Sequence, residues 1–317
     1  MSGVVVNASW KPERAVQIVA GTPPGGGVDR VARALVEAIA EAGVVEVPLT
    51  VANVPGGGAR KAWTSFVDNH AGDGHVIGIS SPNLTTDYLV GASSFEHSKY
   101  TPIATLVTEY IAFAVRSDSP LKSGADFLAQ LGRDASSATV ALSTALGNPN
   151  HIALAKLVRG AGGDVNAPII RVFDSALDAV ADVVAGSADV CAVTAASVLA
   201  ELGAGRLRLI GISAPKRLSG AFDATPTWQE QTWQAQSADC VVGAWRGVTG
   251  PAGLSPAQIA YWATVLRAAT QQPVWHKALA RLSWSPLYQD GAELRAYLAK
   301  ERAEFVNVLG ELGLLKV

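Results

Sequence analysis

AVQIVAGTPPGGGVD, residues Ala15 to Asp29, joins an apolar strand pattern to a Pro-Pro-Gly-Gly-Gly turn, and a helical pattern follows from Arg30 to Ala42. The three glycines carry no Cβ, so the backbone can take positive φ and a ligand can lie directly against main-chain N–H groups. The helix that begins after them directs its unpaired amides and the positive end of its dipole at the same place. The loop is therefore either an anion-binding site or a connector that only turns the chain.

Strand patterns and helical patterns alternate along most of the chain. AVQIVA, PLTVAN and VIGIS are separated by helical patterns at 30–42 and 60–69, and after Ser123 the alternation restarts with TVALS, IIRV, ADVCAV and LRLIGIS. Such alternation predicts parallel strands with helices on both faces of the sheet. We therefore expect an α/β protein with two mainly parallel sheets, one in each of two units.

The C-terminal part differs, because three helical patterns follow one another at 256–271, 273–282 and 291–312. These helices must pack on an earlier unit. We expect a discontinuous lobe 1 from residues 1–108 and 241–317, with lobe 2 formed by residues 109–240. Two chain crossings make a hinge, and a cleft between the lobes would lie at the carboxyl ends of strands, where α/β sheets place their ligands.

Composition limits the possible partners. The 317 residues are 49% hydrophobic and 16% charged, with a net charge of −2, so no basic surface for nucleic acid is expected. No apolar run is long enough to span a bilayer. The N-terminus lacks the features of a secretory leader, so the protein either stays inside or has lost its leader. Cys191 and Cys240 make no disulfide scaffold and are expected to be small buried residues.

The first loop partly fits one enzyme motif, but the sequence lacks the residues that complete it. Gly21 to Gly27 fits GxxxGxG, the nucleotide loop of short-chain dehydrogenases, but these enzymes need a Tyr and a Lys four residues apart, whereas Tyr297 and Lys300 are three apart. GxGxxG, GxxxxGK[ST] and GxSxG do not occur, although a hydrolase whose groups converge only in space is not excluded. The histidines form no HxxxH pair and the cysteines no CxxC, so no metal site is expected.

Two further polar segments follow strand patterns. STALGNPNH, from Ser143 to His151, follows TVALS and leads into a helical pattern, as the first loop does. Asn148 or Asn150, taken alone, is best interpreted as a helix N-cap. SSPNLT, from Ser80 to Thr85, is a polar turn that ends VIGIS. We expect all three segments to line one cleft.

These motifs together resemble the Bug, or TctC-like, substrate-binding receptors of tripartite tricarboxylate transporters. PPGGGVDRVARAL at 23–35 is similar to the family's PPGGGxD loop and helix, and NVPGGGARKAW at 53–63 to its NxPGxGG segment. DGHVIGI at 73–79 and STALGNPNHIALAKL at 143–157 follow in the family's order, as do GRLRLIGISAPKR, ATPTWQE and AWRGVTGPAGLSP.

The resemblance implies a two-lobed, type II periplasmic binding protein that closes over an organic carboxylate and delivers it to membrane transporter subunits. It implies no catalysis and no cofactor, a periplasmic location after removal of a leader, and a monomer. The open alternatives are an NAD(P)-dependent oxidoreductase and a sensor that signals ligand occupancy to a partner. Asp29, in the first turn of its helix, is interpreted as a partner of the helix dipole and not as a catalytic acid.

Departures from the family pattern affect the far end of the ligand. RVFDSA at 171–176 stands where relatives often have VPYKG, and AWRG at 244–247 where they often have AWFG. Arg246 or Arg171 would pair with a second anionic group, or face solvent. Trp245 would stack on an aromatic acid, or serve in packing. The ligand is expected to be a di- or aromatic acid.

The candidate ligand-binding residues are Thr22, Pro23, Gly25, Gly26, Gly27, Val28, Asp29, Ser81, Asn83, Ser143, Thr144, Gly147, Asn148, Asn150, His151, Asp174, Thr194, Trp245 and Arg246.

Overall fold

The computed structural model describes residues 10–95, 99–231 and 240–317. The described residues form two compact units. Of the described residues, unit 1 contains 10–88, 93–95, 99–108 and 245–302, and unit 2 contains 89–92, 109–231, 240–244 and 303–317. Residues 1–9, on which the leader expectation partly rests, lie outside the described residues.

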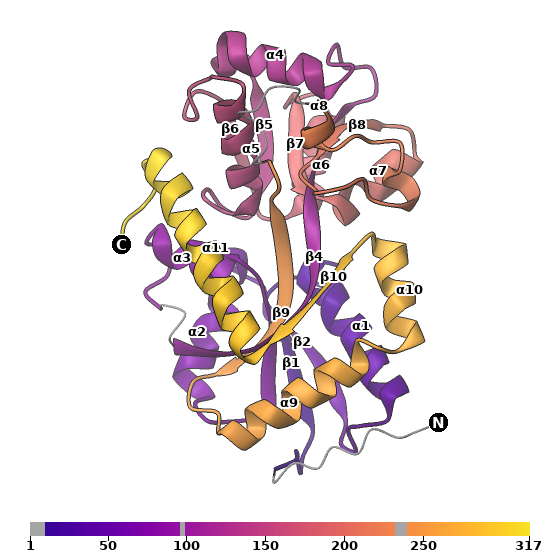
Figure 1. Cartoon of the computed structure of the whole chain (residues 1–317), viewed down its shortest axis with the longest axis vertical. Coiled ribbons are helices and arrows are strands. Elements are labelled where there is room, and N and C mark those ends of the chain that lie inside the picture. Colours follow the sequence, from indigo (N-terminus) through magenta and orange to yellow (C-terminus); the bar gives the residue numbers. More distant parts are fainter. Residues whose placement is uncertain (1–9, 96–98, 232–239) are drawn as a thin grey trace. The chain divides into compact units, whose positions relative to one another are not determined.

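The sheet of unit 1 combines parallel and antiparallel strands (Figure 1). Its strands are β1 (Val16–Ala20), β2 (Leu49–Asn53), β3 (Val76–Ser80), β9 (Gly243–Pro251), β10 (Ser285–Asp290) and the first half of β4 (Tyr100–Arg116). β1 pairs in parallel with β2 and β3, as the strand–helix alternation predicts. β9 runs antiparallel to β3, and β10 antiparallel to β4, so the sheet is mixed.

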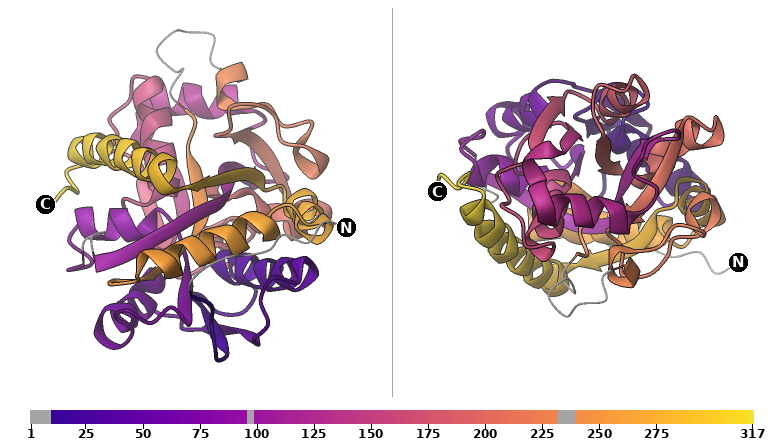
Figure 2. Two further views of the ribbon diagram at one scale, coloured as in Figure 1. Left: turned by 60° about the horizontal axis from the view of Figure 1, so that its bottom comes forward. Right: turned by 90° about the horizontal axis from the view of Figure 1, so that it is seen from above.

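Helices cover both faces of this sheet. They are α1 (Gly27–Ala42), η1 (Gly57–Ala59), α2 (Arg60–Asn69), α3 (Asn83–Leu89), α9 (Pro256–Ala269), α10 (Pro273–Leu282) and α11 (Gly291–Glu311), the last of which ends in unit 2. Val16 and Ile18 of β1 share one core with α1, α9 and α10, whereas Val19 packs against Trp63 and Phe66 of α2. Alternate strand residues therefore serve opposite faces. Figure 2 shows α9 and α10 beside α1.

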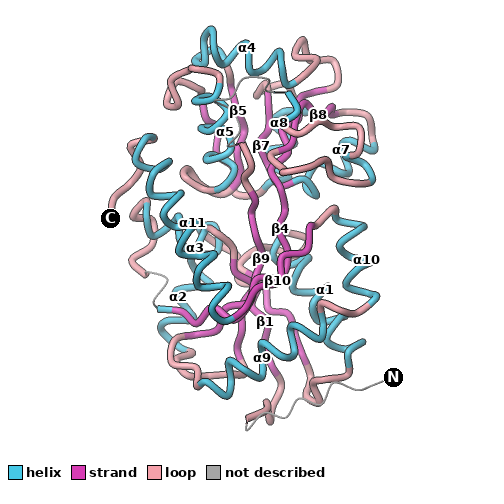
Figure 3. Tube along the Cα trace, in the orientation of Figure 1, coloured by secondary structure: helices cyan, strands magenta, loops and turns pink. Residues whose placement is uncertain are grey.

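Unit 2 repeats the same strand–helix plan, and Figure 3 marks its strands and helices along the trace. Its elements are the second half of β4, α4 (Gly124–Asp134), η3 (Ala135–Ser137), β5 (Thr139–Ser143), α5 (Pro149–Gly160), β6 (Ile169–Phe173), α6 (Ala176–Val184), β7 (Val190–Thr194), η4 (Ala195–Val198), α7 (Leu199–Gly203), β8 (Leu207–Ile212), η5 (Gly220–Phe222) and α8 (Trp228–Gln231). β6, β5 and β7 are parallel, and β4 runs antiparallel to β7 and β8.

The core of unit 2 also has two sides. Ala112 and Ala114 of β4 pack with α6, whereas the ring of Phe113 between them packs against Phe127 of α4 and Trp228 of α8. Cys191 of β7 is fully buried, as expected, and burial raises the pKa of its thiol to about 12. Cys240 is buried as well. Neither cysteine is in a disulfide.

The polar segments follow strands, as the sequence predicts. The first loop joins β1 to α1 in unit 1, and the second joins β5 to α5 in unit 2. The segment expected as a polar turn, Ser80 to Thr85, is shorter than predicted because α3 begins at Asn83. Its short Asn-Leu-Thr-Thr sequence carries too little helical periodicity to be recognised.

Candidate functional site

Asp29 holds the first loop together. Its carboxylate is 1% exposed, and Oδ2 accepts hydrogen bonds from the N–H of Gly25 over 2.7 Å and from Nε of Arg33 over 3.0 Å. Oδ1 accepts from Nδ2 of Asn53 over 2.8 Å. Burial by itself raises the pKa of Asp29, but the bonds from Arg33, Asn53 and Gly25 outweigh it, so the pKa lies below its usual value. Asp29 is thus an ionised brace of the loop.

Two partners of this brace were missed in the sequence analysis. Arg33 lies one helical turn after Asp29, at the spacing that favours ion pairs, and that spacing was the available signal. Asn53 closes β2, and its Nδ2 also donates to the carbonyl oxygen of Thr22 over 2.9 Å. Because Ala20 and Asn53 are paired residues of the parallel strands β1 and β2, the amide reaches the loop that follows β1.

Two positions of the first loop require glycine, each for a different reason. Gly25 has φ +83°, a conformation that side-chain-bearing residues rarely adopt. Gly26 has an ordinary φ of −68°, but a Cβ there would lie 2.7 Å from Oγ1 of Thr22. Gly26 is therefore required by close approach, and Gly25 by backbone conformation.

Some amides of the loop remain available for binding. The N–H of Gly25 donates to Asp29, and that of Gly26 to the carbonyl oxygen of Pro23 over 3.1 Å. The N–H groups of Gly27 and Val28 donate to no acceptor within the described part of the chain. Thr22 Oγ1 is likewise buried and has no partner there. These donors lie at the N-terminus of the 16-residue helix α1, where the dipole favours an anion.

The second loop is braced by its own side chains. Asn148 is the N-cap of α5, because its Oδ1 accepts from the N–H groups of Asn150 and His151. Its Nδ2 donates to the carbonyl oxygen of Ser143 over 2.5 Å and to Oγ1 of Thr144 over 3.0 Å. Asn150 Nδ2 donates to the Ser143 hydroxyl over 2.9 Å. The amide side chains therefore hold the loop's shape.

His151 also stabilises the second loop. Its Nδ1 accepts a hydrogen bond from the N–H of Gly147 over 3.0 Å, and the ring is 6% exposed. Burial lowers the pKa of His151 to about 4, so the imidazole is neutral at physiological pH. Gly147 has φ +78°, and a Cβ there would lie 2.9 Å from side chains of Val90 and Leu309.

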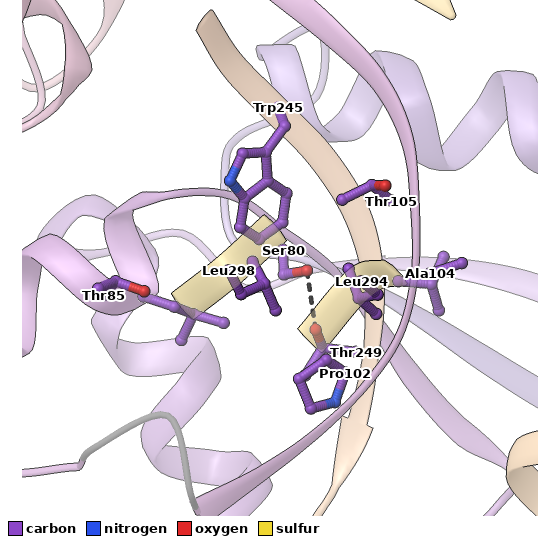
Figure 4. A pocket seen from close by; sticks show the side chains of 11 residues that line it. Ser80, Thr85, Pro102, Ala104, Thr105, Trp245, Thr249, Leu294 and Leu298 are labelled. Atoms are coloured by element: carbon purple, nitrogen blue, oxygen red, sulfur yellow. Dashed lines mark hydrogen bonds between the residues drawn. The ribbon is translucent and has the colours of Figure 1, made fainter. Parts of the chain in front are cut away.

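Trp245 lies in unit 1 close to the turn after β3. Its indole Nε1 donates to Oε2 of Glu301 over 2.7 Å, and the ring packs against Leu294 and Leu298 of α11. Trp245 and Ser80 both line a small pocket in unit 1 (Figure 4). The hydroxyl of Ser80 accepts a hydrogen bond from Thr249 Oγ1 over 2.8 Å. The residues that line this pocket are Ser80, Leu84, Thr85, Pro102, Ala104, Thr105, Trp245, Val248, Thr249, Leu294 and Leu298. Ser81 and Asn83 are partly buried in the same turn.

The remaining candidate residues lie outside these three segments. Arg171 is held by Asp182 through Nε and Nη2, at 2.8 Å and 2.9 Å, so its charge is already paired on the surface of unit 2. Asp174 is exposed. Thr194, at the end of β7, is buried with its hydroxyl 3.1 Å from that of Ser197. Arg246 Nη1 donates to the carbonyl oxygen of Trp245 over 3.2 Å.

Among residues 10–95, 99–231 and 240–317, no three His, Cys, Asp or Glu side chains are grouped so as to hold a metal ion. Within the same ranges, every helix is too short or too polar to cross a membrane.

Comparison with known proteins agrees with the architecture. The family described as "Tripartite tricarboxylate transporter family receptor" matches residues 31–314. Protein BugT of Bordetella pertussis is 24% identical over 314 residues, covering 97% of this chain and 92% of BugT. The sequence resemblance to this family is confirmed.

Solved structures show the same fold. A Rhodopseudomonas palustris protein solved with adipate has a TM-score of 0.83 at 18% identity, covering 96% of this chain and 99% of that protein. MatC from Rhodopseudomonas palustris with bound malate has a TM-score of 0.77 at 21% identity, covering 94% and 99%. The expected α/β, two-lobed type II periplasmic binding protein fold is thereby confirmed.

Proposed function

This chain belongs to the receptor family of the tripartite tricarboxylate transporters, and on that premise we propose that it is a periplasmic solute-binding protein for a small organic carboxylate. It delivers this solute to the membrane subunits of a transporter and does not alter it chemically. The bound malate and adipate of two proteins of similar fold support a di-acid as the class of solute. We further propose that it acts as a monomer without a cofactor.

The observation that carries the proposal is the set of donors in the first loop. The N–H groups of Gly27 and Val28 begin a long helix, and the loop's own carboxylate, Asp29, is engaged by Arg33 and Asn53. A negative group from outside the chain is the natural acceptor for such donors. Each hydrogen bond to an ionised carboxylate contributes about 1.5–3 kcal/mol, so several such donors acting together are needed to exceed the cost of association.

In this proposal the solute binds in a cleft between the two lobes. The loop at 22–29 holds one carboxylate, the loop at 143–151 completes the contact on closure, and the turn at 81–83 lines the same cleft. Asp174, Thr194, Trp245 and Arg246 are proposed to meet the far end of the solute. Binding selects the closed form because only that form offers both loops to one ligand.

A thermal-shift screen tests the function directly. The protein is heated with adipate, succinate, malate or benzoate, each compared with the corresponding amide. At least one acid is expected to raise the melting temperature, because binding to the native state stabilises it, while its amide does not. Equal shifts from acid and amide would contradict carboxylate recognition.

Two controls address the enzyme and delivery parts of the proposal. Incubation with NADPH should leave tryptophan fluorescence and the acid itself unchanged, whereas turnover of the acid would contradict a binding role. Delivery is tested by capture of detergent-solubilised transporter subunits on the immobilised protein with and without the acid. Capture of a signalling partner in their place would favour a sensor.

A further inference from the structure

Arg30 is a cation that lies beside the first loop, on α1 immediately after Asp29. Its Nη1 donates to the carbonyl oxygen of Gly25 over 2.9 Å, which fixes the guanidinium against the loop. Nε and Nη2 of the same group are buried, and neither has an acceptor among the residues that the structure describes. Buried donors of a charged group are costly to leave without an acceptor, so these two atoms indicate a place for a negative group.

The geometry of the guanidinium limits what that group is. Nε and Nη2 form one edge with two parallel N–H bonds, which matches the two oxygens of a carboxylate. The chain itself uses this edge in that way. Arg171 binds Asp182 through Nε and Nη2, and Arg206 binds Glu201 through the same two atoms. The equivalent edge of Arg30 is thus of a kind that holds carboxylates elsewhere in this protein.

The surroundings of Arg30 agree with an anionic partner from outside the chain. Thr22 Oγ1, in the same loop, is also buried without a partner within the described ranges, and a hydroxyl can donate. The carboxylate of Asp29 is already bound by Gly25, Arg33 and Asn53. The loop therefore offers a cation and a hydroxyl while its own anion is occupied.

We propose that Arg30 is the residue that reads the charge of the solute, its Nε–Nη2 edge binding one carboxylate in bidentate fashion. This rests on the proposed function and deepens it, because the main-chain amides are neutral donors, whereas the guanidinium adds a full positive charge beside the carboxylate. The contact between Nη1 and Gly25 positions the guanidinium before the solute arrives. The consequence is a receptor that selects ionised carboxylates over amides and esters of the same shape.

Calorimetry on Arg30→Met and Arg30→Lys tests the proposal. Wild type and variants are titrated with adipate and adipamide, with benzoate and benzamide, and with inorganic phosphate. Arg30→Met should lower the affinity for the acid by roughly 30-fold or more, since it removes one partner of a buried charge pair. The affinity for the amide should stay as it is in wild type, so that the preference for acid over amide is lost. Arg30→Lys keeps the charge without the two parallel N–H donors of the guanidinium and should recover only part of the preference.

Arg133→Met, on the exposed last turn of α4, is the matched control for loss of an arginine and should bind as wild type does.

The outcomes separate this inference from the proposed function. If wild type binds none of the acids, the proposed function is contradicted and this inference with it. If wild type binds an acid and Arg30→Met keeps the full preference over the amide, only the role of Arg30 is overturned. Equal weakening of acid and amide, with a lower melting temperature of the ligand-free variant, would mean that Arg30 only braces Gly25. Preferential binding of phosphate would overturn the assignment to carboxylates.

Discussion

Asn53 donates a hydrogen bond of 2.8 Å from Nδ2 to Oδ1 of Asp29, although 24 positions separate the two residues. The pairing of Ala20 with Asn53 in the parallel strands β1 and β2 brings them together. The same Nδ2 reaches the carbonyl oxygen of Thr22. One amide thus connects the end of one strand with both the start of the first loop and the helix that follows it.

Removing this connection should loosen the loop. Asn53→Ala removes the donor to the Thr22 carbonyl oxygen and leaves Oδ1 of Asp29 with Nη2 of Arg33 alone, at 3.0 Å, which should lower the free energy of unfolding by about 1–3 kcal/mol and weaken binding of the acid. Urea unfolding and calorimetry measure the two effects. Asn69→Ala is the control, because Asn69 makes one exposed contact with Ser65. Unchanged stability and affinity in Asn53→Ala would contradict the brace.

Gly26 should be intolerant of a side chain for a steric reason. A Cβ at this position lies 2.7 Å from Oγ1 of Thr22, so Gly26→Val must displace the turn whose amides we propose to bind the acid. The expected result is loss of the acid-dependent thermal shift in a protein that is still folded by circular dichroism. Gly310→Val, where a Cβ meets open space on α11, should keep the shift. Retained binding in Gly26→Val would remove this loop from the site.

His151 should make the protein less stable in mild acid. Its pKa is lowered to about 4 by burial, so below pH 6.5 the unfolded chain binds a proton that the native ring does not. The free energy of unfolding therefore falls from this cause as the pH drops from 6.5 towards 4. Between pH 7 and pH 5 the contribution is about 2 kcal/mol.

The contribution is isolated by comparison with His151→Gln. The difference in unfolding free energy between wild type and this variant, measured in urea at pH 7 and at pH 5, should shrink by that amount. His276→Gln, at an exposed position of α10, is the matched control for loss of a histidine. A pH-independent difference for His151→Gln would contradict a neutral native imidazole.

Asp87 should titrate in the opposite sense. Burial raises its pKa to about 6, and Arg60, 3.5 Å away, partly offsets this. Its contribution to stability is fully present below about pH 3.8 and is lost as the pH rises through 6. Arg60→Met removes the offsetting charge, so the pKa of Asp87 should rise further. Carbon-detected NMR of the Asp87 carboxyl measures this directly.

The control for Asp87 is Lys61→Met, which removes an exposed cation from the next residue of the same helix. It should leave the Asp87 titration close to that of wild type. A pKa of Asp87 that is unchanged or lower in Arg60→Met would show that the ion pair does not act on this carboxyl.

The sequence by itself determined the local features of this protein. Strand and helix patterns such as VIGIS, TVALS and the helix at 60–69 coincide with β3, β5 and α2, because their periodicity and bounding residues are local properties. The order of the glycine-rich segments was sufficient to identify the family. The sequence also predicted an N-cap at Asn148 or Asn150, and the structure assigns it to Asn148, whose hydrogen-bond donors are the N–H groups two and three residues further on.

Only the tertiary structure decided how these local features are connected. Nothing in the sequence near Asp29 indicates Asn53, because their contact follows from the register of two parallel strands. The 17-residue strand β4 shows no alternation because most of its residues are buried, so its length and its antiparallel partners were not predicted. The buried edge of Arg30 depends on the same packing: a sequence places a cation one residue after Asp29, but burial decides whether its donors face water or require an acceptor.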